Sequence, residues 1–174
     1  MPGVGRLALV KRLAWYLNVP FRTVRAFVPA LARPDDTFAA RWLPPAELEL
    51  YLAMDVRDRD HACRVARAVL RRHPEAPEKL VRASLLHDVG KSGAPFSPWL
   101  RVAVHVYRPR QAPAPGAGSR LADALRRHHQ HPQLGAAMIL ACGGDPDVAE
   151  LVRHHHDAEG PPGADAIRSV DALT

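Results

Sequence analysis

Residues 85–91 of the chain read Leu-Leu-His-Asp-Val-Gly-Lys. The histidine of this stretch, His87, follows apolar and small side chains at positions 80, 83 and 84, so at helical spacing it projects from a face that should be buried. Asp88 comes next, at a predicted helix end. An ionised carboxylate or an imidazole inside a protein must be paired, because burying one alone costs a large free energy. The stretch therefore predicts a helix that carries polar groups into a core.

The rest of the sequence predicts further helices, separated by Pro and Gly. No segment alternates with period two, so no strand is expected. Asp58 is the predicted N-cap of a helix to about residue 72, and Pro77-Glu78 opens one to about residue 89. The other expected helices are two short ones within 1–42, one opening at Pro44-Pro45, and those near 97–107, 120–128, 132–142, 145–156 and the last ten residues, with a Pro-rich loop at 109–118. This pattern predicts an all-α fold, a compact bundle of about eight to ten helices.

The composition is that of an ordinary globular chain. It has 174 residues, of which 47% are hydrophobic and 24% are charged, so it can bury a core without disulfides. Cys63 and Cys142 are isolated, which excludes a thiolate zinc finger and a disulfide framework. No apolar run reaches the ~20 residues of a membrane span, and no secretory signal is recognised. We therefore expect a cytoplasmic protein without an integral membrane segment.

The net charge of +6 is concentrated near the N-terminus. Residues 1–34 contain six Lys or Arg and no acid, and from Asp35 onward the charges cancel. We predict a basic amphipathic helical extension over 1–42 and a second unit over 43–174. Such a helix either packs on the body with its arginines in water or contacts nucleic acid or a membrane surface through residues 1–34.

Histidines are frequent, ten in all, and several share helical stripes with apolar residues. His61, His155 and Asp171 each lie on such a stripe, as His87 does. A single buried histidine is usually satisfied within the core, but several on different helices are hard to explain separately. A shared metal site would satisfy all of them at once, because imidazole and carboxylate are both metal ligands.

The ordered pattern of His, His-Asp, His, His and Asp resembles the HD superfamily of metal-dependent phosphohydrolases. The residues that carry the resemblance, within about 48–174, are His61, His87-Asp88, His131, His155 and Asp171. The hexapeptide His-Pro-Gln-Leu-Gly-Ala at 131–136 adds to it. The resemblance implies an HD-domain bundle over 43–174 that hydrolyses a phosphate ester or anhydride in a small molecule of nucleotide type.

The resemblance also implies roles for the matched residues. One metal would be held by His61, His87, Asp88 and Asp171. A second would be held by His131 and His155, with Asp88 as the bridge between the two. Lys91, which matches the lysine that follows the His-Asp doublet in some members, would touch substrate phosphate.

Two positions have alternatives nearby. His128 and His129 are further candidates for the third position, and His154 and His156 for the fourth. Helical periodicity favours His155, and the Pro-x-x-Gly that follows His131 favours His131 by resemblance. His156 matches the second histidine of the His-His-Glu in cyclic-dinucleotide phosphodiesterases of the superfamily, with Asp157 in place of Glu, and is assigned to substrate binding.

These residue types suit phosphoryl transfer. Two divalent ions and two carboxylates leave a charge of about +2, which favours phosphate oxygens. Imidazole with carboxylate suits Mn, Fe, Co, Ni or Zn, and we expect one or two such ions. A water shared by two ions has its pKa lowered toward ~7, so that metal-bound hydroxide attacks phosphorus, with Asp88 and Lys91 as the catalytic residues. The alternatives are a one-metal nucleotidase, which would not need His131 and His155, and a catalytically silent nucleotide-binding regulatory domain.

Overall fold

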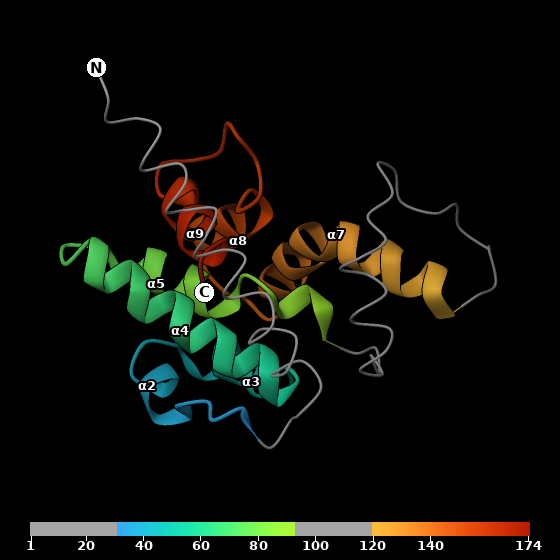
Figure 1. Ribbon diagram of the computed structural model, residues 1–174, viewed down its shortest axis with the longest axis horizontal. Coiled ribbons are helices and arrows are strands. Elements are labelled where there is room, and N and C mark those ends of the chain that lie inside the picture. Colours follow the sequence, from blue (N-terminus) through green and yellow to red (C-terminus); the bar gives the residue numbers. More distant parts are fainter. Residues whose placement is uncertain (1–30, 93–119) are drawn as a thin grey trace, which may run out of the picture.

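The computed structural model describes residues 31–92 and 120–174, which form helices and no strand. The α-helices are α2 (Asp36–Ala40), α3 (Pro45–Leu52), α4 (Val56–Arg72), α5 (Glu78–Leu86), α7 (Arg120–Ala141), α8 (Pro146–Arg153) and α9 (Ala164–Asp171), and a 3-10 turn, η2 (Val89–Lys91), follows α5 (Figure 1). The all-α prediction is confirmed. Seven α-helices in the described ranges are fewer than the eight to ten expected for the chain. The two short helices predicted within 1–42 fall largely on residues 1–30, which lie outside the described residues, as do the helix predicted at 97–107 and the loop at 109–118. No helix of the described part has the length and apolar character of a membrane span.

The long helix α4 begins before its predicted start. Asp55 caps it, because its carboxylate accepts a 2.9 Å hydrogen bond from the backbone N–H of Arg57. Asp58, the predicted cap, lies in the first turn and is buried. The sequence prediction was wrong here because both aspartates fit the local capping pattern, and the packing of the helix decides which one turns inward.

Helices α5 and α8 each stop about three residues before their predicted ends, at Leu86 and Arg153. The residues that follow, among them His87 and His155, lie in turns rather than in the helices. The last carbonyls of a helix have no backbone partner within it. The two early ends therefore release carbonyl groups close to histidines.

Helix α7 runs through Pro132, where the sequence predicted a break between helices at 120–128 and 132–142. Pro132 has no N–H, so the carbonyl of His128 loses its usual backbone partner. The imidazole of His131 takes that place, with Nδ1 2.6 Å from the oxygen of His128. The buried face of the helix continues past the proline and holds both halves in line. The prediction of a break was wrong because the local rule for proline does not include this packing.

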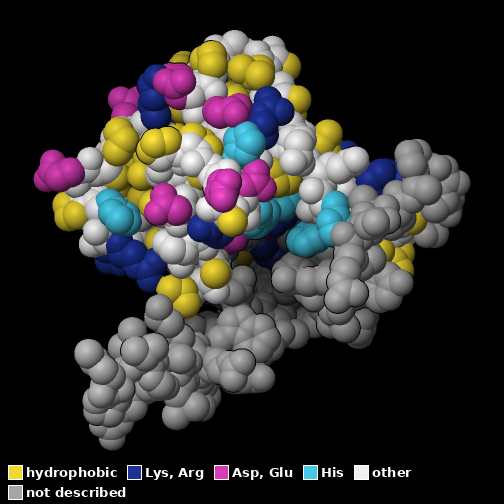
Figure 2. All heavy atoms as spheres, turned by 90° about the horizontal axis from the view of Figure 1, so that it is seen from above, with side chains coloured by type: hydrophobic (Ala, Val, Ile, Leu, Met, Phe, Trp, Pro, Cys, Tyr) yellow, Lys and Arg dark blue, Asp and Glu magenta, His cyan; other side chains and the backbone are white. Residues whose placement is uncertain are grey.

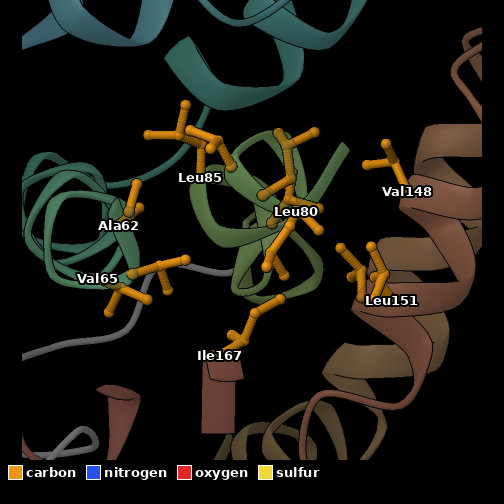
Figure 3. Close-up of a cluster of buried hydrophobic side chains, with 14 of the residues drawn as sticks. Ala62, Val65, Leu80, Leu85, Val148, Leu151 and Ile167 are labelled. Carbon is orange, nitrogen blue, oxygen red and sulfur yellow. The ribbon is translucent and has the colours of Figure 1, made fainter. Parts of the chain in front are cut away.

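Helix α5 lies at the centre of the core. In Figure 3 it stands between α4, α8 and α9, and the labelled buried side chains of these helices are Leu80, Leu85, Ala62, Val65, Val148, Leu151 and Ile167. Burial of each large aliphatic side chain stabilises the fold by about 1.5–3 kcal/mol. His87, which directly follows α5, is therefore carried into the middle of the protein and is fully buried.

The turn η2 packs against α7 at very close range. A Cβ atom at Gly90 would lie 2.1 Å from the carbonyl oxygen of His131 and 2.7 Å from the nitrogen of Gly135, both backbone atoms. Only a residue without a Cβ fits at this distance. The close approach brings Asp88, two residues before Gly90, beside His131 in α7.

A buried ion pair joins α3 to α5. Arg82 donates two hydrogen bonds to the carboxylate of Glu47, at 2.6 and 3.0 Å. The backbone N–H of Asp145, before α8, donates to the same carboxylate at 3.3 Å. Since a buried charge must be paired, these contacts fix α3 and the start of α8 relative to the central helix.

Candidate metal centre

The structure brings the six predicted ligands together in one place. His61 comes from α4, His87 from the end of α5, Asp88 from the start of η2, His131 from the middle of α7, His155 from just after α8, and Asp171 from the end of α9. Figure 2 shows histidine side chains gathered toward the middle of one face, beside acidic and basic side chains. Ends or breaks of helices supply most of these positions.

The first group of ligand atoms combines three helices. His61, His87 and Asp88 can each offer one atom so that all three lie within 4.8 Å of one another. The Nε2 atom of His61 lies 2.7 Å from Oδ1 of Asp171, and Nε2 of His87 lies 3.7 Å from the same oxygen. Asp171, the last residue of α9, thus faces the same point as the other three.

The second group consists of His131, His155 and His156, whose ligand atoms also lie within 4.8 Å of one another. The Nε2 atoms of His131 and His155 are 3.4 Å apart. The sequence analysis assigned His156 to substrate binding and also named it as an alternative for the fourth ligand position. The structure places its ring against that of His155, with centroids 4.0 Å apart.

Asp88 lies between the two groups. Its Oδ2 is 3.6 Å from Nε2 of His87, and its Oδ1 is 3.3 Å from Nε2 of His131. Each carboxylate oxygen therefore faces one group. This is the position of a carboxylate that can bridge two ions.

Three buried histidines are held in the same way. The Nδ1 of each lies within hydrogen-bond distance of the carbonyl oxygen three residues earlier: 2.9 Å for His87, 2.6 Å for His131 and 2.6 Å for His155. A carbonyl only accepts, so Nδ1–H is the donor in each ring, and Nε2 is the nitrogen that is left to face the site. Metal-binding histidines are fixed by such a hydrogen bond at the ring nitrogen that does not bind the ion.

An unpaired buried nitrogen fits a cation. The Nε2 of His87 is buried and has no hydrogen-bond partner among the described residues. Buried polar atoms of this kind are rare in native proteins and indicate a missing partner such as an ion. The donor set of imidazole nitrogens and carboxylate oxygens fits Mn, Fe, Co, Ni or Zn.

The electrostatics of the second group favour neutral ligands. Burial lowers the pKa of His155 to about 2, and partial covering of the His156 ring lowers its pKa to about 4. Burial also lowers the pKa of His131. In the first group, burial opposes the charge of His87, but Asp88 and Asp171 outweigh it and raise the pKa to about 9. At pH 7 the histidines of the second group can therefore bind an ion without releasing a proton.

The two aspartates stay ionised. Burial raises the pKa of Asp88, but Lys91, followed by His87 and His131, outweighs it and holds this pKa well below its usual range. Burial likewise opposes ionisation of Asp171, but the hydrogen bond with His61, followed by the influence of the nearby His87 ring, outweighs it and depresses the pKa of Asp171. The ammonium of Lys91 lies 2.7 Å from each Asp88 oxygen, so a positive charge already sits at the bridging carboxylate.

The neighbouring histidines lie outside these groups. The ring of His128 is stacked on that of His131 with centroids 5.8 Å apart, and His129 is exposed. His154 is hydrogen-bonded to Asp157 at 2.6 Å and to Glu150 at 2.9 Å. None of the three belongs to the clusters of ligand atoms found in the described part of the chain.

Residues 58–173, which include all six predicted ligands, match the protein-family model for the HD domain. No match was found among curated proteins or among solved structures. The family match confirms the resemblance seen in the sequence.

Proposed function

The chain belongs to the HD-domain family, which is typical of metal-dependent phosphohydrolases, and we propose that it hydrolyses a phosphate ester or anhydride of a nucleotide-type small molecule at a two-metal site. The observation that carries this proposal is the position of Asp88 between two clusters of ligand atoms. A one-metal nucleotidase would use the first cluster alone. The second cluster, with three histidines turned toward one point, supports two ions.

The ligand sets follow from the clusters. The first ion would be held by His61, His87, Asp88 and Asp171. The second would be held by Asp88, His131, His155 and His156. When bound, two divalent ions would supply positive charge for the phosphate oxygens and an activated water at neutral pH.

The chain's own residues account for the rest of the proposed site. The carboxylates of Asp88 and Asp171 are ionised and balance part of the metal charge. Lys91 is held at Asp88 by its hydrogen bonds, so its ammonium is positioned at the edge of the site, where it would hold a phosphate oxygen. Burial opposes the charge of Lys91, but the neighbouring Asp88 outweighs it and raises the pKa of Lys91, so the ammonium stays protonated.

The first test is the metal content of untagged protein by elemental analysis. We expect about two transition-metal ions per chain, with both lost or weakened in Asp88→Ala and retained in Asp165→Ala, an exposed aspartate of α9 that serves as the matched control. A content of one ion would favour the one-metal nucleotidase. No metal, even after incubation with Mn, Fe and Zn, would refute the proposal and favour a silent nucleotide-binding domain.

The second test is turnover of a panel of substrates by the loaded protein. Cyclic dinucleotides, dinucleoside polyphosphates and nucleoside monophosphates differ in the bond that is cleaved but share the phosphate that the site would bind. We expect Lys91→Met to lower turnover while the metal content stays unchanged. Full activity of Asp88→Ala on any of these substrates would contradict the assignment.

A further inference from the structure

A proline lies in the middle of the longest described helix. Pro132 is inside α7, which runs from Arg120 to Ala141, and it is buried. A helix interior is the least favourable position for proline, because the ring crowds the preceding turn and a hydrogen bond is lost. Pro132 also directly follows His131, a predicted ligand. We therefore asked how Pro132 affects the neighbouring ligand.

The consequence is a free carbonyl group. In an uninterrupted helix the carbonyl of His128 would accept the N–H of residue 132. Pro132 has no N–H, so the carbonyl is available to another donor. The Nδ1 of His131 lies 2.6 Å from this oxygen. The side chain of His131 thus replaces the backbone bond that its neighbour cannot make.

The other two buried histidines obtain the same bond differently. His87 donates to the carbonyl of Ser84 and His155 to that of Val152, at 2.9 and 2.6 Å. Both carbonyls belong to the last turn of a helix that has just ended, where they have no helical partner. His131 lies ten residues before the end of α7, so no helix end is available to it.

We propose that Pro132 is a positioning residue for the second metal group. By removing the competing N–H, it reserves the carbonyl of His128 for His131 and fixes the ring with Nε2 toward Asp88 and His155, at 3.3 and 3.4 Å. This inference rests on the proposed metal-dependent function. It goes further because it assigns a role to a residue that binds neither metal nor substrate.

The test is Pro132→Ala in the full chain, titrated with Co²⁺ by calorimetry. The new N–H competes for the carbonyl of His128, so we expect the second Co²⁺ to bind about 10–100-fold more weakly, as for other losses of a partner behind a metal ligand. The visible absorption of bound Co²⁺, which reports its ligands, should change for the same ion. The melting temperature of the metal-free variant should equal or exceed that of the wild type, because alanine is the better helix former. If the proline had a purely structural role, its substitution would lower the melting temperature, and a weaker affinity for Co²⁺ at unchanged stability would not be seen.

The matched control is Pro146→Ala. Pro146 is exposed and occupies the first turn of α8, where an N–H has no helical partner in any case. We expect it to leave both Co²⁺ affinities unchanged. Equal affinities of Pro132→Ala and wild type would overturn the inference while leaving the proposed function intact. Absence of Co²⁺ binding by the wild type would overturn both.

A second measurement does not depend on how well the variant folds. The nitrogen chemical shifts of His131 in the metal-free wild-type protein report which ring nitrogen carries the proton. We expect a proton on Nδ1 and none on Nε2 at neutral pH. A wild-type ring with Nδ1 unprotonated would overturn the inference, whatever the variant does.

Discussion

Because η2 and α7 lie so close together, we predict that a single added methyl group at Gly90 has a large effect on stability and on the site. In Gly90→Ala the new Cβ would lie 2.1 Å from the carbonyl oxygen of His131, whereas ordinary contacts begin at 3.4 Å. The nearest atoms all belong to the backbone, so no side-chain rotation relieves the clash. The turn and the helix must therefore separate by about 1 Å. Such overpacking costs roughly 1–3 kcal/mol or more of folding free energy.

The separation acts directly on the site. Asp88, two residues before Gly90, faces Nε2 of His131 at 3.3 Å across the same contact. Metal–ligand bonds tolerate only about 0.2 Å of displacement, so a shift of 1 Å removes Asp88 from one of the two groups. We expect the variant to lose one of two bound ions and at least about 100-fold in turnover. Calorimetric titration with Co²⁺ and urea denaturation of the metal-free form measure the two effects.

A second glycine supplies the control. Gly143 has a φ of +77°, and no atom lies within 4 Å of the position that a Cβ would take there, so alanine suffers backbone strain alone. We expect Gly143→Ala to lose about 1–2 kcal/mol of stability with unchanged metal binding. If Gly90→Ala keeps both ions at wild-type affinity, or if Gly143→Ala loses an ion as well, the argument from the close contact is refuted.

Three further predictions concern residues that are not proposed as ligands. Glu47→Ala removes the buried partner of Arg82 and leaves it with the exposed Glu78, 3.6 Å away. The variant should lose about 3 kcal/mol in urea denaturation without altering metal content, and a loss below about 1 kcal/mol would contradict the role of the pair. Hydrogen bonds, of which the one from Thr37 has the largest effect, lower the pKa of Asp35 to about 2. The ionised Asp35 therefore stabilises the fold above the unfolded pKa of about 4, and this contribution is lost as the pH falls toward 2. Denaturation from pH 5 to 2 should therefore show a shallower decline in Asp35→Asn, and parallel curves would refute this. Burial raises the pKa of the Cys63 thiol, so alkylation at pH 8 should be slow in the native protein and rapid in urea, as mass spectrometry of the Cys63 peptide would show.

Much of the fold was readable from local pattern. Apolar stripes at helical spacing and the Pro and Gly residues between them predicted α5, α8 and α9 and the absence of strands. The same stripes pointed His87, His155 and Asp171 toward the core, where the structure places them together. Local pattern sufficed because each of these residues lies at or near the end of a short amphipathic helix whose buried face is unambiguous.

The remaining features depend on contacts between distant residues. The ion pair of Glu47 with Arg82 joins positions 35 residues apart, and the clearance at Gly90 depends on where α7 lies. Neither has a local signal. The continuity of α7 through Pro132 was missed because the rule that proline ends a helix takes no account of the packing that holds both halves in line, nor of the imidazole that bonds to the freed carbonyl.

A bundle of continuous helices offers few places to anchor a metal-binding histidine. Inside such a bundle most carbonyls already accept a backbone N–H, so few of them are open to the Nδ1–H of an imidazole. This chain meets the difficulty in two ways, by stopping α5 and α8 at the site and by placing Pro132 within α7. An unbroken helix and a metal-binding histidine therefore compete for the same carbonyl groups here. Substitutions that complete or lengthen helices near the site should therefore stabilise the metal-free protein and lower its affinity for metal. If the proline and the helix ends were purely structural, the same substitutions would lower stability and leave metal affinity unchanged.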